Sequence, residues 1–409
     1  MRSAIFTVFI LILGLQPATA NDWHIMTDWH KAQGEARSAY FAAGSRFNSL
    51  PPRTFTAIRL AMFTAANAVE KQYTQYLEGI EAGQDADAII AASAAAGHVM
   101  RTAFGQSAEA VIAKQEQKYF AGADPKVLKA SIALGKAAAE AALARAAEVT
   151  DDKYPHYKPQ TSAGVYITPH MPAFPPEFLD QKPWFIESRD AVRAAPPPAL
   201  DSDVWARDFN EVKRLGGRNS TDRTQEQQSE ALFWVGQSNE MLIDQVAERR
   251  NWTFLQTARL YAMLEMSIDD STLAVAESKY HHNFWRPITS IRRAELDGRD
   301  DTTVDAGWTP FRRTPNHPEY PCAHCTRGGG TAEILENEVE LMDGETFRVF
   351  DPRTPDNYIT IKSFAEFEER MSNSRIYIGA HYRSSNEAGE KMGRDVAKIA
   401  RQTFAVPLN

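Results

Sequence analysis

Residues Asp124–Ala147, which read DPKVLKASIALGKAAAEAALARAA, decide the fold class of this 409-residue chain. The stretch is rich in alanine, leucine and lysine and has few β-branched residues. It begins with aspartate, which is a good N-terminal helix cap. Asp85–Phe104 has the same character, and Pro51-Pro52 precede a third helical pattern that runs to about Leu77. Because alternating strand patterns are absent from residues 28–148, we expect a packed helical bundle there.

The rest of the chain also favours helices, with one irregular segment between the two helical parts. Residues 155–198 hold ten of the 22 prolines, which excludes long helices. The segment also carries the aromatic residues Phe174, Phe178, Trp184 and Phe185, which favour an ordered loop that wraps over a core. Helical patterns resume at Asp201, and we expect one helix over Thr221–Arg250 and another over Asn251–Tyr280. The predicted fold class is therefore all-α.

The N-terminal residues have the pattern of a secretory signal peptide. Arg2 is followed by an apolar run from Ala4 to Leu15, and Ala18-Thr19-Ala20 forms a small-x-small cleavage signature. The run of about twelve residues is shorter than the roughly 20 that a membrane-spanning helix needs. We therefore expect an exported protein, periplasmic or secreted, without a membrane span.

Four regions follow from these patterns. We expect a signal peptide over 1–20, an N-terminal helical bundle over 21–150, a Pro-rich wrapping segment over 151–200 and a C-terminal helical domain over 201–409. The formal net charge of −8 argues against general binding of nucleic acids or anionic membranes. Any anion site on this chain must therefore be a local cluster of basic residues.

Basic side chains gather in three short stretches of the C-terminal part, and the first is KYHHNFWRP, residues 279–287. Seven helical steps separate Lys279 from Arg286 and bring a side chain back to within about 20° of its start. Both cations would then share one helix face. Pro287 disfavours helix at Arg286, which places this arginine at a helix end. Two cations on one face indicate an anion site, although a solvated charged face has the same pattern.

The second stretch is PEYPCAHCTRGGG, residues 318–330, and we expect a helix to follow it over Thr331–Met342. The turn before such a helix can offer backbone N–H groups to an anion. His324 would lie in that turn, where its imidazole is a candidate acid or base.

The third stretch is SRIYIGAHYRSSNE, residues 374–387. Ser384 and Glu387 have the spacing of a capping box for a helix that reaches almost to the C-terminus. Arg375 and His381 would lie in the approach to that helix. Arginine offers a planar fork for an oxyanion, and histidine offers a nucleophilic or metal-ligating nitrogen.

In this order, the three stretches read Lys-x6-Arg-Pro, Pro-x-x-His and Ser-Arg-x5-His. They resemble the signature of the type 2 phosphatidic acid phosphatase/vanadium haloperoxidase superfamily. The runs FWRPIT (284–289), NHPEYP (316–321) and IYIG (376–379) look like its bacterial haloperoxidase-related branch, and the resemblance covers about residues 180–405. It implies an all-helical fold with a C-terminal bundle of the acid phosphatase/vanadium haloperoxidase type, in which the stretches converge on one vanadate or phosphate.

The resemblance also implies roles for individual residues. The N–H of Ala323 would donate a hydrogen bond to the anion. His381 would ligate vanadium or attack phosphorus, and His324 would be the general acid or base. His317 stands where bromide-oxidising relatives carry histidine. The cations that would neutralise the oxygens of the anion are Lys279, Arg286 and Arg375.

Three positions depart from the family pattern. The family's Pro-Ser-Gly-His is Pro-Cys-Ala-His here, so Cys322 replaces a serine and Ala323 replaces a glycine. A thiol is a weaker donor than a hydroxyl, and a Cys322–Cys325 disulfide would have no donor. Ser385 stands where the family has an aspartate that orients the ligating histidine. Its loss should lower the basicity of His381 and loosen its ring orientation.

Three functions stay open at this point. The first is a vanadium-dependent haloperoxidase that oxidises halide with hydrogen peroxide, and the second is an exported acid phosphatase that uses a phosphohistidine. The third is a weakly active or non-catalytic relative that binds an anion or acts in redox chemistry through Cys322 and Cys325. A thioredoxin-like site would need a βαβ pattern, which the sequence lacks. A zinc site is disfavoured because no second ligand pair has finger-type spacing.

Overall fold

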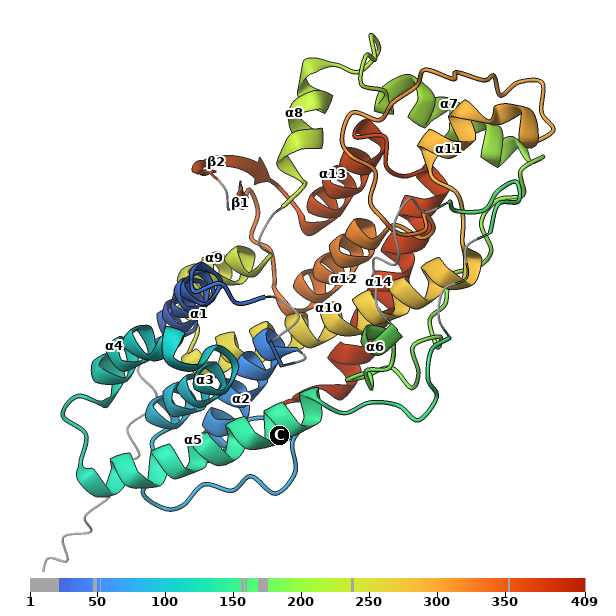
Figure 1. The fold of residues 1–409 in the computed structure, drawn as a ribbon. Helices are drawn as coiled ribbons and strands as arrows, with labels where there is room; N and C mark the ends of the chain where they lie inside the picture. Colours follow the sequence, from blue (N-terminus) through green and yellow to red (C-terminus); the bar gives the residue numbers. More distant parts are fainter. Residues whose placement is uncertain are drawn as a thin grey trace, which may run out of the picture.

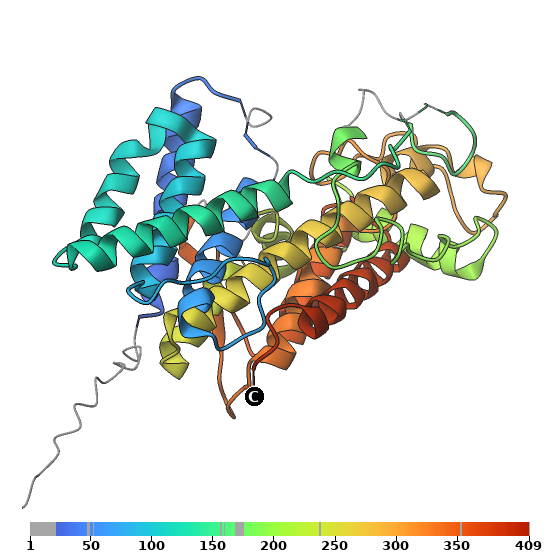
Figure 2. The same ribbon diagram turned by 90° about the horizontal axis from the view of Figure 1, so that it is seen from below.

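The computed structural model describes residues 22–46, 50–51, 53–155, 158, 160–167, 176–236, 239–351 and 354–408. The predicted signal peptide and Phe174 lie outside these residues. The described chain is mostly helical, which confirms the all-α fold class. Its N-terminal helices lie at one end of an elongated molecule and its C-terminal bundle lies at the other (Figure 1, Figure 2).

Helices α1 to α5 build the N-terminal end. The predicted helix that begins at Asp124 is α5, and the Asp124 side chain caps it by accepting the N–H of Lys126 at 2.8 Å. The predicted helix over Asp85–Phe104 is α3, and its cap is Asp87 rather than Asp85. The bounds are α1 His24–Ala42, α2 Thr54–Glu70, α3 Ala88–Phe104, α4 Glu109–Phe120 and α5 Pro125–Ala146, with a 3-10 turn η2 over Gly105–Ala108.

Two predicted helices were wrong in extent. Helix α2 ends at Glu70 rather than near Leu77, because Lys71 adopts a left-handed conformation with φ of 55°. The segment expected to form one helix over Thr221–Arg250 forms two, α8 Gln225–Phe233 and α9 Glu240–Arg250. Asn239, directly before α9, is buried, and its Nδ2 donates to Thr331 Oγ1 at 2.7 Å. This contact joins residues far apart in sequence, so local periodicity does not reveal the break.

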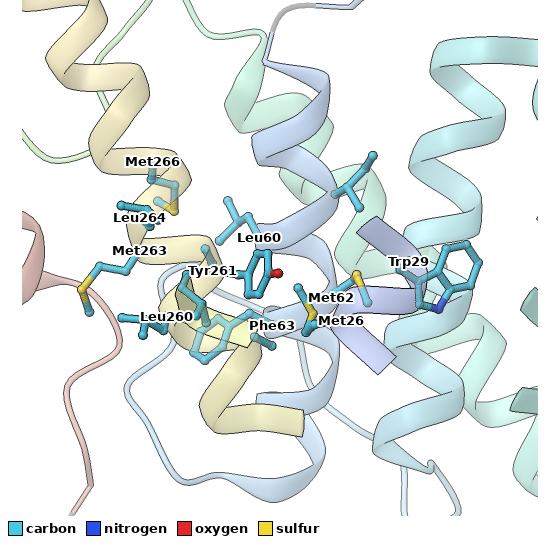
Figure 3. Close-up of a cluster of buried hydrophobic side chains, with 14 of the residues drawn as sticks. Met26, Trp29, Leu60, Met62, Phe63, Leu260, Tyr261, Met263, Leu264 and Met266 are labelled. Carbon is cyan, nitrogen blue, oxygen red and sulfur yellow. The ribbon is translucent and has the colours of Figure 1, made fainter. Parts of the chain in front are cut away.

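Helix α10, Phe254–His282, runs from the N-terminal helices into the C-terminal bundle (Figure 1). Its first half belongs to the same hydrophobic core as α1 and α2. Figure 3 shows this core, in which the labelled side chains are Met26, Trp29, Leu60, Met62, Phe63, Leu260, Tyr261, Met263, Leu264 and Met266. All of them are buried. The N-terminal bundle therefore anchors the helix whose last turn carries Lys279.

The described part of the Pro-rich segment crosses α10 as an irregular chain that includes the short helix α6, Pro176–Leu179. The N–H groups of Trp184, Phe185 and Ile186 donate to the carboxylate of Asp270 at 2.7, 2.7 and 3.2 Å. Trp184 Nε1 also donates to Asp269 at 3.0 Å. These bonds fix this part of the segment on the helix.

In the C-terminal bundle α12 and α14 pack beside α10, and α13 packs against α12 and α14 (Figure 1, Figure 2). An antiparallel hairpin, which the sequence did not predict, joins α12 to α13 and pairs Phe347 with Ile361. No helix among the described residues is both long and apolar enough to cross a membrane. The remaining bounds are α7 Asp203–Gly216, α11 Pro287–Arg292, η3 Ala294–Leu296, α12 Ala323–Glu338, β1 Phe347–Asp351, β2 Thr354–Ile361, α13 Phe364–Tyr377 and α14 Arg383–Thr403.

Glycines let α12 and α14 approach each other closely. A Cβ on Gly393 would lie 1.9 Å from the carbonyl oxygen of Thr326, and one on Gly329 would lie 2.4 Å from that of Glu390. Near the start of both helices, a Cβ on Gly389 would lie 2.4 Å from the carbonyl oxygen of Cys322. The Gly-Gly-Gly run that was expected to precede a helix therefore lies within one, and it serves packing.

We predict that Gly393→Ala lowers the free energy of unfolding by about 1–3 kcal/mol, because the methyl group forces two packed helices apart. Urea denaturation followed by circular dichroism measures this change. The matched control is Gly34→Ala in α1, where a Cβ would meet nothing within 4 Å. Alanine there should raise stability by about 0.5–1 kcal/mol. Equal effects of the two substitutions would contradict the close packing.

Candidate oxyanion site

The three basic stretches meet where α10 and α13 end and where α12 begins. Lys279 lies in the last turn of α10, and Arg375 lies in the last turn of α13. Arg286 is the N-cap residue of α11, and His324 lies in the first turn of α12. His381 lies in the connection between α13 and α14. Four helix ends and the connection between α13 and α14 thus supply the candidate residues.

Lys279 and Arg286 come together by a chain reversal, so the prediction that they share one helix face was wrong. Helix α10 ends at His282, and Asn283 follows in a left-handed conformation with φ of 45°. Arg286 is then extended, with ψ of 155°, and Pro287 opens α11. The effect expected from Pro287, an arginine at a helix end, is confirmed.

Backbone carbonyls surround the buried guanidinium of Arg286. Its Nε donates to the carbonyl oxygen of His317 at 2.9 Å, and its Nη1 donates to that of Ala380 at 2.8 Å. The Nη1 atom also lies 3.2 Å from Nε2 of His381, and Nη2 lies 3.0 Å from Nδ1 of His317. Burial lowers the pKa of Arg286 to about 10, so this arginine stays charged at neutral pH. It connects the second stretch to the third.

The ammonium group of Lys279 is also buried and hydrogen-bonded. Its Nζ donates to the carbonyl oxygens of Pro318 at 3.2 Å and Glu319 at 2.9 Å, and to that of Pro321. The peptide bond between Tyr320 and Pro321 is cis. Burial, followed by repulsion from Arg286, lowers the pKa of Lys279 well below its usual value. In this arrangement Lys279 holds the turn before α12 and adds positive charge to the site.

Arg375 is the exception among the three cations. The residue is 4% exposed, its buried Nε atom has no hydrogen-bond partner, and its guanidinium makes no hydrogen bond or ion pair with any described residue. Burial, followed by repulsion from Arg286, lowers the pKa of Arg375 to about 9. A buried cation without a partner is strongly unfavourable unless an anion joins it. Arg375 is therefore the clearest sign of an anion site.

Glu319 orients His381, a role that the sequence analysis missed. Its Oε1 atom lies 2.8 Å from Nδ1 of His381 and accepts the N–H of Tyr382 at 3.1 Å. Ser385 Oγ lies farther from the same Nδ1, at 3.4 Å. The expectation that Ser385 leaves the ring without an orienting carboxylate was therefore wrong. The available signal was that Glu319 is the one acidic residue in the second stretch, directly after His-Pro.

This contact determines which nitrogen of His381 is available for chemistry. The carboxylate of Glu319 accepts a hydrogen bond from the Nδ1–H group, so Nε2 keeps its lone pair. Burial, then repulsion from Arg286, Lys279 and Arg375, lowers the pKa of His381 well below its usual value. The imidazole is neutral, and its Nε2 atom can act as a ligand or a nucleophile.

The second stretch begins α12 instead of preceding it, because the helix runs over Ala323–Glu338 and not over Thr331–Met342. Cys322 is the N-cap residue, and its Sγ accepts the N–H of Cys325 at 3.1 Å. Cys322 and Cys325 form a disulfide, so Cys322 has no thiol proton to donate. The N–H of Ala323 has no preceding helical carbonyl to bond, as at any helix N-terminus, and suits an anion.

His324 lies beside the same cations and is half-buried. Its ring forms a hydrogen bond with the backbone of Val235. Burial, followed by repulsion from Arg375, lowers the pKa of His324 well below its usual value. An anion next to Arg375 would reverse part of this shift, because an opposite charge favours the protonated ring.

The third stretch does not contain the expected capping box. Helix α14 begins at Arg383, and the N-cap residue Tyr382 forms no side-chain cap bond. The N–H of Ser384 instead donates to Asp208 of α7 at 2.8 Å. Gly379, with φ of +76°, packs so closely on α7 that a Cβ would lie 2.4 Å from the carbonyl oxygen of Gly216. Contacts with α7 thus position the segment that carries His381.

The donor set fits a tetrahedral oxyanion such as vanadate or phosphate. Three cations, Lys279, Arg286 and Arg375, lie around His381, and the carboxylate of Glu319 is directed toward Nδ1 of its ring. Arg375 supplies unpaired donors, α12 supplies its N-terminal N–H groups, and His381 supplies Nε2. Among the described residues, no group of three or more His, Cys, Asp or Glu side chains could hold a metal cation.

Comparison with known proteins identifies the class of fold. A bacterial vanadium-dependent iodoperoxidase superposes with a TM-score of 0.71 at 21% identity, over 92% of this chain and 96% of that one. A bacterial vanadium-dependent chloroperoxidase in its holo form superposes with a TM-score of 0.66 at 14% identity, over 91% and 92% of the two chains. The chain therefore has the all-α vanadium haloperoxidase fold.

The sequence comparisons find similarity over the C-terminal part of the chain. Residues 259–408 match the family described as the VCPO second helical-bundle domain. The vanadium chloroperoxidase of Curvularia inaequalis is 26% identical to this chain, in a match that spans 34% of this chain and 29% of that protein. The match to this domain family is confined to residues 259–408, which include all three basic stretches.

We predict that Arg375→Met raises the free energy of unfolding of the anion-free protein by about 1–4 kcal/mol, because it removes an unpaired buried charge. The same substitution should abolish sulfate binding measured by isothermal titration calorimetry. The control is Arg250→Met, because the Arg250 guanidinium pairs with Glu345 far from the site. This variant should keep sulfate binding. An Arg375→Met protein that is less stable and still binds sulfate would contradict the site.

We also predict that sulfate binds about three- to tenfold more tightly at pH 6 than at pH 8. Burial raises the pKa of Glu319 to about 7, although Arg286 and Lys279 oppose the shift. Its protonation on acidification removes the one negative charge beside His381, while sulfate keeps its own charge. The groups that face this carboxyl group are Lys279, Arg286, His381, Tyr382 and Ser385.

Glu319→Gln keeps an oxygen acceptor for His381 and should flatten this pH profile. The control is Glu345→Gln, because arginine contacts hold the pKa of Glu345 at about 2 and it does not titrate in this range. That variant should keep the wild-type profile. If sulfate affinity in Glu319→Gln changes with pH as it does in the wild type, the pH dependence belongs to Lys279 or the histidines instead of Glu319.

Proposed function

We propose that this protein is a vanadium-dependent haloperoxidase that uses hydrogen peroxide to oxidise halide. The observation that carries the proposal is the unpaired Arg375 beside a neutral His381, whose Nδ1 contacts Glu319. This combination suits a permanently bound oxyanion with a nitrogen ligand. The similarity of the chain to an iodoperoxidase and two chloroperoxidases also supports it.

The residues of the chain would divide the work as follows. Arg375 and Arg286 would hold the vanadate oxygens, with the N–H of Ala323 as a further donor, and Nε2 of His381 would be the vanadium ligand. Glu319 keeps the His381 ring in the tautomer with a free Nε2 lone pair. Bound vanadate would supply the Lewis acidity that activates hydrogen peroxide towards two-electron reduction by halide.

His324 is placed to move the protons. The anion would raise its pKa from the depressed value that Arg375 imposes, so the ring could take a proton from peroxide and return it later. Burial excludes bulk water from Arg286, Arg375 and His381, which strengthens each electrostatic contact with the anion. His317 contacts Arg286 through Nδ1 at 3.0 Å, in the position where bromide-oxidising relatives carry histidine. Bromide is therefore the halide to test first.

A second candidate function is an acid phosphatase, and the free Nε2 of His381 favours it. The same cations would hold a phosphoryl group while this nitrogen attacks phosphorus and His324 protonates the leaving oxygen. A weakly active relative is the third candidate. It is favoured by the disulfide at Cys322, which removes a donor that the family has as serine. For all three candidates we propose export after cleavage of residues 1–20.

The test is bromide oxidation by the purified apoprotein with orthovanadate and hydrogen peroxide, beside hydrolysis of p-nitrophenyl phosphate. We expect vanadate-dependent bromide oxidation that falls by at least about 100-fold in His381→Ala and in His324→Ala. The control is His281→Ala, which changes an exposed histidine at the end of α10. Phosphatase activity that vanadate inhibits, without bromide oxidation, would overturn the peroxidase proposal. Neither activity in a folded protein would support the non-catalytic alternative.

A further inference from the structure

An arginine-rich cavity of about 800 Å³ lies next to the candidate site. We propose that it binds an organic anion with an aromatic or apolar body, which is the molecule that the oxidised halide modifies. The use of this ligand as a substrate rests on the proposed function, whereas its binding does not.

The wall of the cavity is apolar on one side. Tyr166 is buried, and its backbone N–H donates to the carbonyl oxygen of Asn283 at 2.8 Å, which fixes it against the loop between α10 and α11. Its hydroxyl group donates to Asn316 at 3.1 Å. The other apolar residues of the wall are Ile167, Ile288, Pro310 and Pro315. Such a wall suits a flat apolar body better than a lone halide ion. The cavity is also far larger than a halide ion.

The polar side of the cavity is strongly positive. Its arginines are Arg218, Arg286, Arg292, Arg293, Arg312 and Arg313, and none of the described residues that line it is acidic. The exposed Arg218, Arg312 and Arg313 make no ion pair with any described residue. Arg292 bonds the carbonyl oxygen of Trp308 at 2.8 Å, and Arg293 pairs with Glu295.

This local excess of positive charge stands out on a chain with a net charge of −8. Uncompensated arginines that surround an apolar wall attract an anion from solution and fix its orientation. A carboxylate, sulfonate or phosphate attached to an aromatic ring satisfies both sides of the cavity at once.

Arg286 connects the cavity to the candidate site. It lines the cavity, and its Nη1 atom lies 3.2 Å from Nε2 of His381. Asn316, another lining residue, directly precedes His317. An organic anion bound in the cavity would therefore lie next to the site where halide is oxidised.

The reaction balances with the reagents of the proposed function. Hydrogen peroxide, a halide ion and a proton give hypohalous acid and water, so the halide loses two electrons and the O–O bond breaks. The halogen of the hypohalous acid then bonds to an aromatic carbon, which releases its proton. The products are the aryl halide and a second water.

The binding test uses the apoprotein without vanadate, halide salts or peroxide, so that failure of the proposed function does not affect it. Isothermal titration calorimetry would compare 2-naphthoate with 2-naphthylmethanol, its neutral counterpart, in a buffer of low ionic strength. We expect naphthoate to bind at least about tenfold more tightly, which corresponds to about 1.4 kcal/mol. Added sodium sulfate should weaken the binding of naphthoate and not that of the alcohol.

The variant is Arg218→Gln/Arg313→Gln, which we expect to weaken naphthoate binding by about tenfold. The matched control is Arg348→Gln/Lys362→Gln, which removes two exposed cations that do not line the cavity. Thermal denaturation checks that both variants fold. Equal affinity for naphthoate and the alcohol, or equal losses in the two variants, would overturn the proposal. Naphthoate binding that Arg375→Met abolishes, and the cavity variant does not affect, would also overturn it by placing the ligand in the oxyanion site.

Discussion

The burial of three cations around a single histidine is the constraint on which the C-terminal bundle depends. Transferring a charged group out of water costs several kcal/mol even in a relaxed protein interior. Hydrogen bonds to backbone carbonyls offset this desolvation cost for two of the cations. Lys279 bonds carbonyls of the turn before α12, and Arg286 bonds that of Ala380. Arg375 receives no such compensation from the described residues, so the fold carries a cost that a bound anion would relieve.

Much of the surrounding architecture brings helix ends to this point. The left-handed Asn283 reverses the chain after α10, and Gly379 lets the connection between α13 and α14 pack closely on α7. Glycines hold α12 and α14 at close range, so that His324 and His381 lie near the starts of two packed helices. The N-terminal bundle acts at a distance by sharing its core with the first half of α10.

Local patterns predicted the helical class and the positions of most helices, because capping residues and alanine-rich periodicity act within a few residues. The order of the three basic stretches also indicated which cations and histidines would gather. The contact between Glu319 and His381 spans 62 positions, and no local rule connects them. The prediction that Lys279 and Arg286 share one helix face was wrong for a related reason. It assumed a single helix from Lys279 to Arg286, whereas the chain reverses direction at Asn283. The predicted capping box at Ser384 does not form, because Asp208 on another helix accepts the backbone N–H of Ser384.

Glu319 changes the chemical interpretation of Ser385. An orienting carboxylate is present, and it comes from the second stretch instead of the third, so His381 keeps a defined tautomer. The disulfide at Cys322 still removes one neutral donor. The central claim, an oxyanion site built on Arg375 and His381, is tested most directly by a crystal structure with orthovanadate and anomalous scattering data for vanadium. We expect vanadium to be bonded to Nε2 of His381, and the vanadate oxygens to accept hydrogen bonds from Arg375. Vanadium found elsewhere, or absent while Arg375 keeps no partner, would contradict it.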